Sequence, residues 1–176
     1  MENQVLDAIR TRRSIRKYTN EQVTDEELRT VLEAGTFAPT GKNLQDPVII
    51  AVQNPEIIAR LVRMNALIMG ADSNPYYGAQ TIVLVFAPLP EINYNSVQDG
   101  SLVLGTMMLA AHSIGLASCW INREREMFAT PEGQRMMKDF GVPEGYMGIG
   151  ALALGHPAIA NPKALPRKEN YFKVIK

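Results

Sequence analysis

The chain has very few of the residues that build disulfides and zinc sites. It contains one cysteine, Cys119, and two histidines, His112 and His156, which lie far apart in the sequence. One cysteine excludes a disulfide framework within the chain, and these three residues cannot assemble a histidine/cysteine zinc site. The composition fits a reducing compartment, and we expect a cytoplasmic protein.

The chain also has no excess of charge of either sign. Its 18 Lys and Arg residues balance 18 Asp and Glu residues, so the formal net charge is zero. The overall field that attracts nucleic acid or an anionic membrane surface is therefore missing. We expect no nucleic-acid partner and no membrane partner, and any anion site has to be local.

Charged side chains are absent from a long internal stretch. Residues 101–122, SLVLGTMMLAAHSIGLASCWIN, contain none over 22 positions, which is enough in principle to span a bilayer. Gly115 argues against a span, because glycine commonly ends a helix, and the following LASCWI favours a strand. We predict a helix around 102–114 and then a short strand. A helix that is apolar on all sides has to be buried, in the domain or against a second copy.

Several catalytic motifs are missing as well. Gly35 and Gly41 have the wrong spacing for a triphosphate-binding loop, and residues 148–150 lack the spacing of a dinucleotide-binding turn. No serine stands in a G-x-S-x-G elbow, so no nucleophilic triad can be assigned. Glu124 and Glu126 have no neighbouring feature that marks a catalytic pair, and we expect both to be solvated. We therefore assign no catalytic side chain.

The remaining composition is that of an ordinary globular protein. The 176 residues are 46% hydrophobic, enough for a sizeable core, and we predict a single domain over 1–176. Strand patterns alternate with helical patterns, so the fold class is α/β or α+β. A short first helix near Val5 is followed by predicted helices over 24–37, 55–69, 102–114 and 131–141 and by predicted strands over 47–52, 81–86, 116–121 and 146–154.

The most distinctive motif lies near the N-terminus. Thr11-Arg12-Arg13-Ser14-Ile15-Arg16-Lys17-Tyr18 concentrates four positive side chains and a hydroxyl group in a charge-balanced chain. An arginine fork donates two parallel hydrogen bonds to phosphate and stays charged, and a serine hydroxyl adds a neutral donor. The motif predicts a local phosphate site, although a solvated basic helix face would give the same pattern.

Four ordered segments together resemble the flavin-dependent nitroreductase family. They are TRRSIRKY at 11–18, APTGKNLQ at 38–45, YNSVQDGSLVLGTMMLAAHSIGLASCWI at 94–121 and GVPEGYMGIGALALGHP at 141–157. The resemblance covers almost the whole chain. It implies an α+β fold with a central mixed, mainly antiparallel sheet flanked by helices, in a domain completed by a dimer partner. It also implies flavin mononucleotide (FMN) as the cofactor, which would carry the chemistry that no side chain supplies.

The resemblance further implies which residues bind FMN. The arginine-rich motif would hold the phosphate, helped from the tail by Arg167 or alternatively Lys168, and the turn after LASCWI would face the reactive edge of the ring. The APTGKNLQ loop would reach the flavin from the second subunit, although it departs from relatives at Asp46, where many continue with proline and tryptophan. The implied residues are Arg12, Arg13, Ser14, Arg16, Pro39, Thr40, Gly41, Asn43, Gln45, Asn65, Ile121, Asn122 and Arg167.

The activity that the resemblance implies is that of an NAD(P)H-dependent nitroreductase or quinone reductase. Hydride would pass from NAD(P)H to a nitroaromatic or quinone acceptor in two steps through flavin N5, in a homodimer with shared flavin sites. Two alternatives stay open. The same flavin fold could serve dehalogenation or flavin fragmentation, or the chain could be a non-catalytic module that binds flavin or another phosphate.

Overall fold

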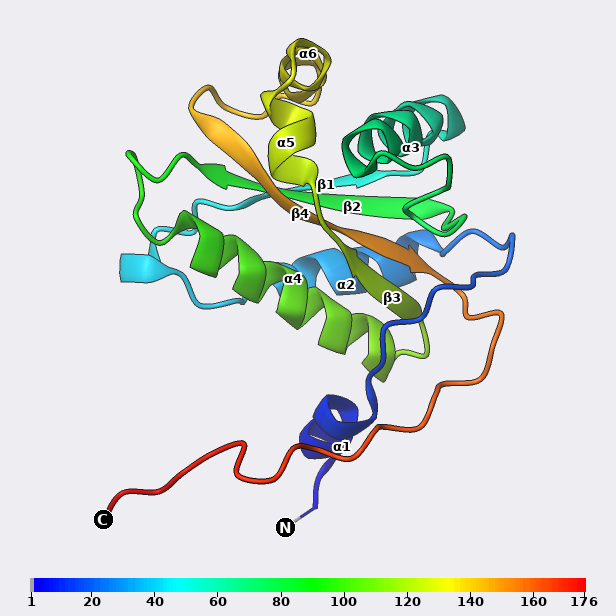
Figure 1. Cartoon of the computed structure of the whole chain (residues 1–176), viewed down its shortest axis with the longest axis vertical. Helices are drawn as coiled ribbons and strands as arrows, with labels where there is room; N and C mark the ends of the chain where they lie inside the picture. Colours follow the sequence, from blue (N-terminus) through cyan, green and yellow to red (C-terminus); the bar gives the residue numbers. More distant parts are fainter. Residues whose placement is uncertain (1) are drawn as a thin grey trace.

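An antiparallel sheet forms the centre of the fold (Figure 1). The structure is a computed structural model that describes residues 2–176. Within that range the strands are β1 (Val48–Val52), β2 (Thr81–Pro88), β3 (Ala117–Ile121) and β4 (Tyr146–Gly155). Their order is β1-β2-β4-β3, and all three ladders are antiparallel. β2 is buried along its whole length, so the apolar run that predicted it marks the middle of the sheet.

Helices cover both faces of this sheet. They are α1 (Gln4–Thr11), α2 (Asp25–Thr36), α3 (Pro55–Met69), α4 (Ser96–Ser113), α5 (Glu124–Ala129) and α6 (Pro131–Asp139), with a 3-10 turn η1 (Gly41–Asn43). α2 and α4 lie on one face and α3, α5 and α6 on the other, while α1 stands apart beside the last turns of α4 (Figure 1). Side chains alternate along β2, so Val83 and Val85 pack toward α4, whereas Leu84 and Phe86 pack into the opposite core.

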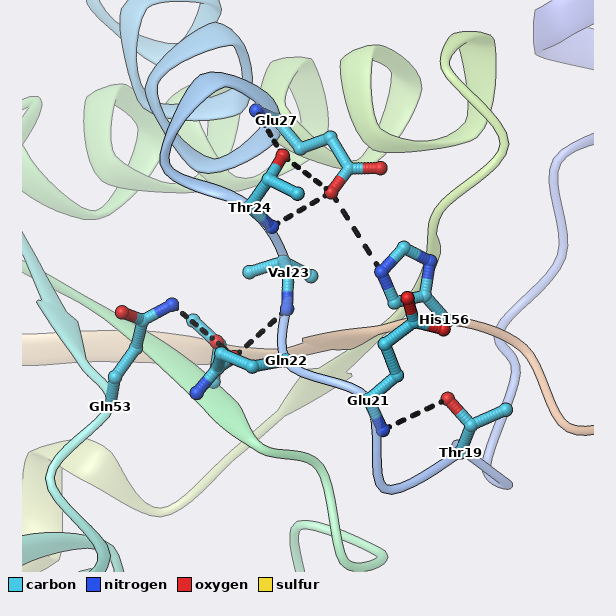
Figure 2. Close-up of polar contacts among 9 residues, drawn as sticks. Thr19, Glu21, Gln22, Val23, Thr24, Glu27, Gln53 and His156 are labelled. Atoms are coloured by element: carbon cyan, nitrogen blue, oxygen red, sulfur yellow. Dashed lines mark hydrogen bonds and ion pairs between the residues drawn. The ribbon is translucent and has the colours of Figure 1, made fainter.

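The start of α2 is fixed by the capping box that its sequence predicts. Thr24 Oγ1 accepts a hydrogen bond from Glu27 N at 3.2 Å, and Glu27 Oε2 accepts one from Thr24 N at 2.8 Å. Thr24 Oγ1 also donates to Glu27 Oε2 at 2.8 Å, and the hydrogen bonds that the backbone and side chain of Thr24 donate to this carboxylate lower the pKa of Glu27. The same carboxylate lies 3.7 Å from His156 Nε2, so the cap also ties α2 to the end of β4 (Figure 2).

The structure departs from the predicted elements in two places. α4 begins at Ser96 rather than near Leu102, because the acidic Asp99 is buried within the helix instead of marking a loop. α5 has six residues, too few for a helical period to be recognised in the sequence, and was not predicted. The sheet itself is antiparallel, and within residues 2–176 the parallel pairing is an isolated bridge between Ser14 and Ser118.

One face of α4 remains open. Val97 and Leu102 are 44% and 46% exposed, and Gly105 faces open space. Next to them, Val5 and Leu109 line a groove between α1 and α4. α4 is therefore buried on its sheet side and exposes apolar surface on its outer side. Among residues 2–176, no helix combines the length and the apolar character needed to cross a membrane.

Candidate functional site

The arginine-rich segment runs along the outer edge of β3. Ile15 is 5% exposed, and its N–H donates to Ser118 O at 3.1 Å, which anchors the segment between its charged neighbours. Tyr18 fixes the other end, because its hydroxyl lies 2.7 Å from Ile15 O and 3.1 Å from Ala153 O and can donate to either. Ile15 and Tyr18 thus anchor the segment, and the arginines on either side of Ile15 lie at the edge of the sheet.

Arg12 carries the strongest sign of an anion site. Its Nη1 atom is buried and has no hydrogen-bond partner within residues 2–176. Burial, and next the adjacent positive charge of Arg13, lower the pKa of Arg12. A buried cationic donor without a partner is costly, and an anion placed there would satisfy it. Arg12 therefore fits a phosphate group.

Arg13 and Arg16 point in different directions. Arg13 turns back onto α1, where Nη2 donates to Arg10 O at 2.7 Å and Nη1 donates to Arg12 O. Arg16 is exposed, and its guanidinium carbon lies 5.8 Å from the centre of the Tyr77 ring in the loop after α3. The hydroxyl-bearing Ser14 is half-buried between them. The three arginines thus share one segment but not one set of contacts.

The turn after β3 lies beyond the arginines along the same strand. Ile121 is buried, Asn122 is exposed, and Arg123 has a φ of 83° in the left-handed region. Asn122 follows Ser118 by four residues, a separation of roughly 13 Å along a strand. β3 therefore connects a cationic end with an exposed backbone turn, which suits an elongated ligand with an anionic tail.

Asn65, which the resemblance assigns to the flavin site, lies behind the turn that follows β3. It is fully buried on α3. Its Nδ2 donates to Asn122 O at 2.9 Å, and its Oδ1 accepts from Arg123 Nε at 2.8 Å. In this structure Asn65 has no exposed surface that could meet a flavin ring, and it holds the turn that follows β3.

The sequence-based expectation for Glu124 was wrong. We expected a solvated carboxylate, but Glu124 is 1% exposed in the first turn of α5. Burial raises the pKa of Glu124 to about 8. The signal that could have identified it is the spacing of Glu124, Met127 and Phe128, which share one helix face at i, i+3 and i+4, and both apolar residues are buried.

The Pro39–Gln45 loop has an unusual backbone. Lys42, Asn43 and Gln45 all have φ between 53° and 56°, which side chains other than glycine seldom adopt. Thr40 Oγ1 accepts from Gln45 N at 3.0 Å, and buried Asp99 accepts from Gly41 N at 3.0 Å. These contacts hold a strained, exposed loop in one shape, as a binding loop requires.

Asp46, the departure from the family pattern, anchors the end of this loop. Its Oδ2 accepts a hydrogen bond from Asn93 Nδ2 at 3.0 Å, and its carbonyl accepts one from Tyr146 Oη at 3.2 Å. Asp46, the extra residue between Gln45 and Pro47, therefore joins the loop to the segment just before α4 and to β4. The local geometry is fixed by polar contacts instead of a tryptophan ring.

The loop and the arginine segment lie at opposite ends of α4. The loop bonds to Asp99 near the start of α4, whereas Thr11 Oγ1 lies 2.8 Å from His112 Nε2 near its end. These two positions are 13 residues apart, which corresponds to roughly 20 Å of helix. In Figure 1 the cyan segment around residues 41–43 lies beside the start of α4, and α1 lies beside its end. One chain therefore does not bring the two motifs together.

The tail residue Arg167 lies apart from these groups. It is exposed, and its Nε and Nη2 donate to Leu165 O at 3.2 and 2.9 Å. The tail approaches the arginine segment at Asn161, whose Nδ2 donates to Thr11 O at 2.8 Å. No hydrogen bond among the described residues links Arg167 or Lys168 to the segment. Cys119 is buried, and burial raises the pKa of its thiol.

Known proteins are similar to this chain in fold and in sequence. The model of the nitroreductase family matches residues 9–81. A nitroreductase of Bacteroides fragilis solved with bound FMN is 31% identical, with a TM-score of 0.90 over 99% of this chain and 100% of that one. A second nitroreductase with bound FMN, from Desulfitobacterium hafniense, is 27% identical, with a TM-score of 0.89 over the whole of both chains.

A curated relative extends the likeness to a named activity. The NADPH-flavin oxidoreductase of Vibrio harveyi is 28% identical over 180 residues, which cover 94% of this chain and 70% of the relative. The matched region includes nearly all of the sheet and both helical layers described above. The α+β fold that the motifs predicted, with a mainly antiparallel sheet, is therefore confirmed.

Proposed function

Because the chain belongs to the nitroreductase family, we propose that it is an FMN-dependent NAD(P)H oxidoreductase. The observation that carries the proposal is the buried, unpartnered guanidinium nitrogen of Arg12 at the edge of β3. An FMN phosphate would satisfy this donor. Relatives with bound FMN or with flavin oxidoreductase names support the same assignment.

The residues around Arg12 fit the two ends of this cofactor. Arg12, Ser14 and Arg16 would hold the phosphate, and Arg13 would support them through the end of α1. The exposed turn at Asn122 would meet the ring, with backbone donors able to stabilise negative charge there. Hydride transfer from NAD(P)H to an electron-poor acceptor, such as a nitroaromatic compound or a quinone, is the chemistry that bound FMN supplies.

The placement of the two motifs supports a shared site in a homodimer. Pairing two α4 helices about a twofold axis perpendicular to them would run them antiparallel and cover the exposed Val97 and Leu102. The start of one α4 would then lie near the end of the other, which would bring Pro39–Gln45 of one copy to the arginines of its partner. Within one chain the loop and the arginines are separated by roughly 20 Å, but in the homodimer the loop of one copy would lie beside the arginines of the other.

The oxidoreductase is tested by the colour and redox behaviour of the purified protein. We expect a yellow protein that bleaches when NAD(P)H is added without oxygen and regains its colour when a quinone is added. Stable FMN binding without bleaching would favour the non-catalytic module instead. A colourless protein that does not bind added FMN would contradict the proposal. The free, buried Cys119 is compatible with the cytoplasmic location that we propose for this activity.

A further inference from the structure

Three polar side chains are buried together behind the turn that follows β3. Asn65 on α3, Tyr76 in the loop after α3, and Glu124 on α5 are 0%, 0% and 1% exposed. Their neighbours in the same core are apolar, including Leu61 and Met127. Burying a carboxyl group and an amide among apolar side chains costs free energy unless they are hydrogen-bonded. The cluster therefore needs an explanation beyond packing.

Asn65 connects the cluster to the turn. Its amide donates to Asn122 O and accepts from the Arg123 side chain, so it holds two consecutive residues. Arg123 has a left-handed φ of 83°, a conformation that is strained for a residue with a side chain. The contacts from Asn65 help keep the turn in this conformation, with Asn122 exposed at the surface.

Tyr76 and Glu124 support Asn65 from the other side. The Tyr76 hydroxyl donates to Glu124 Oε1 at 3.0 Å, and Asn65 Nδ2 lies 3.4 Å from the same oxygen. Gly148 on β4 allows this approach, because a Cβ there would lie 2.5 Å from Glu124 O. The second carboxyl oxygen, Oε2, has no hydrogen-bond partner within residues 2–176.

The charges around Glu124 do not compensate for its burial. Arg123 favours the ionised carboxylate, but Glu126 on the same helix opposes it, and desolvation outweighs both in raising the pKa of Glu124. Tyr76 is neutral, because burial raises its pKa as well. At neutral pH Glu124 is therefore mostly a neutral acid. Ionisation would place a buried charge, which Arg123 offsets only in part, next to Asn65.

We propose that Asn65, Tyr76 and Glu124 position the Asn122–Arg123 turn against the flavin, and that ionisation of Glu124 loosens this turn. The inference rests on the proposed FMN site. None of the three side chains has the exposure needed to touch the cofactor or an acceptor, so they are positioning residues. Their influence passes through the turn that Asn65 holds.

The test measures FMN binding as a function of pH in the wild-type protein and in Glu124→Gln. Glutamine keeps the shape and polarity of the neutral acid but cannot ionise. We expect the wild-type affinity for FMN to fall about tenfold through a transition near pH 8, as expected for losing one or two buried hydrogen bonds. Glu124→Gln should keep the low-pH affinity throughout. Ionisation of the FMN phosphate affects both proteins equally, so the difference between the two curves isolates Glu124.

A redox measurement separates positioning from simple stability. If the turn contacts oxidised and reduced flavin unequally, the midpoint potential of bound FMN should shift between pH 6 and pH 9 differently in the two proteins. A tenfold change in the ratio of the two affinities corresponds to about 30 mV for this two-electron couple. Asn65→Leu, which removes the contacts to the turn, should give the high-pH behaviour of the wild type at pH 6.

The outcomes distinguish this inference from the proposed function. A wild-type protein that binds no FMN at any pH would overturn the proposed function and with it this inference. Parallel curves for the wild type and Glu124→Gln, with FMN bound, would overturn the positioning role alone. Circular dichroism and thermal unfolding of the FMN-free proteins establish that each variant is folded. Should Asn65→Leu not fold, the comparison with Glu124→Gln still decides the question.

Discussion

The arginine segment and the Asn65–Tyr76–Glu124 cluster lie at the two ends of β3, and each contains at least one buried polar atom without a hydrogen-bond partner within residues 2–176. At the first end these atoms are Arg12 Nη1 and Arg13 Nε, and at the second it is Glu124 Oε2. A guanidinium group keeps its charge in proteins, whereas a buried carboxyl group can take up a proton and become neutral. The cationic end therefore requires an anion from outside the chain. The acidic end becomes neutral when Glu124 takes up a proton.

This difference separates a binding site from a support. The cationic end is half-exposed and open to a ligand, and its contacts are incomplete without one. The acidic end is closed to solvent, and its contacts converge on Asn65 and the turn that it holds. Substitutions at the cationic end should therefore change FMN affinity more than folding stability. Substitutions at the acidic end should change folding stability more than FMN affinity.

The largest expected effect is on the pH dependence of stability, and it tests the acidic end. Glu124 has a pKa of about 8 in the folded chain against 4.5 for an ordinary glutamate, so the folded state holds a proton that the unfolded state loses. Stability should therefore decline as the pH rises from about 4.5 and level off above about 8. From the size of the shift, the decline is at most about 5 kcal/mol.

Chemical unfolding at a series of pH values measures this decline. Glu124→Gln should remove most of the pH dependence in this window, because glutamine does not ionise. A decline of the same size in Glu124→Gln would mean that another group causes the pH dependence. It would contradict the neutral state of Glu124 on which the contrast between the two ends of β3 depends.

The next effect is on ligand affinity, and it tests the cationic end. Arg12→Glu should weaken FMN binding at least about a hundredfold, or about 3 kcal/mol, because it removes a charged donor and places a negative charge at the phosphate. Lys17→Glu is the matched control, since Lys17 is exposed on the same segment and is not assigned to the phosphate. Fluorescence titration measures the FMN affinity of both variants. Equal losses of affinity would mean that the overall charge of the segment, and not Arg12 itself, determines FMN binding.

The two ends also differ in what the sequence could predict. The cationic end is a continuous motif, and the fold around it follows from hydrophobic periodicity, from the Thr24–Glu27 capping box and from Pro55 at the start of α3. The acidic end joins residues 65, 76 and 124, which only the fold brings together. Glu124 lies in a helix of six residues, too short to be recognised in the sequence, so its burial was not predicted.

The predicted binding residues divide in the same way. The arginine segment and the turn after β3 lie along the same strand, because a local bridge joins the segment to β3 and the turn directly follows it. Asn65 was assigned by resemblance to the ring, but its position depends on the angle at which α3 packs and on the loop that follows, which sequence patterns do not define. In the proposed homodimer, the loop 39–45 joins the arginines of a second copy. Sequence patterns do not reveal such a contact between copies, and we expected it only from the family resemblance.

The smallest expected effect distinguishes two neighbouring arginines within the cationic end. Arg13→Ala removes hydrogen bonds to the carbonyl groups of Arg10 and Arg12 and should lower the stability of the FMN-free protein by about 1 kcal/mol, since the contacts are partly exposed. FMN affinity should fall less than in Arg12→Ala, because both terminal nitrogens of the Arg13 guanidinium already donate to the carbonyl groups of Arg10 and Arg12. Thermal unfolding and FMN titration of the two variants side by side measure both quantities. If Arg13→Ala lost as much affinity as Arg12→Ala with unchanged stability, Arg13 would be a direct phosphate ligand, and its fork would have to leave α1 when FMN binds.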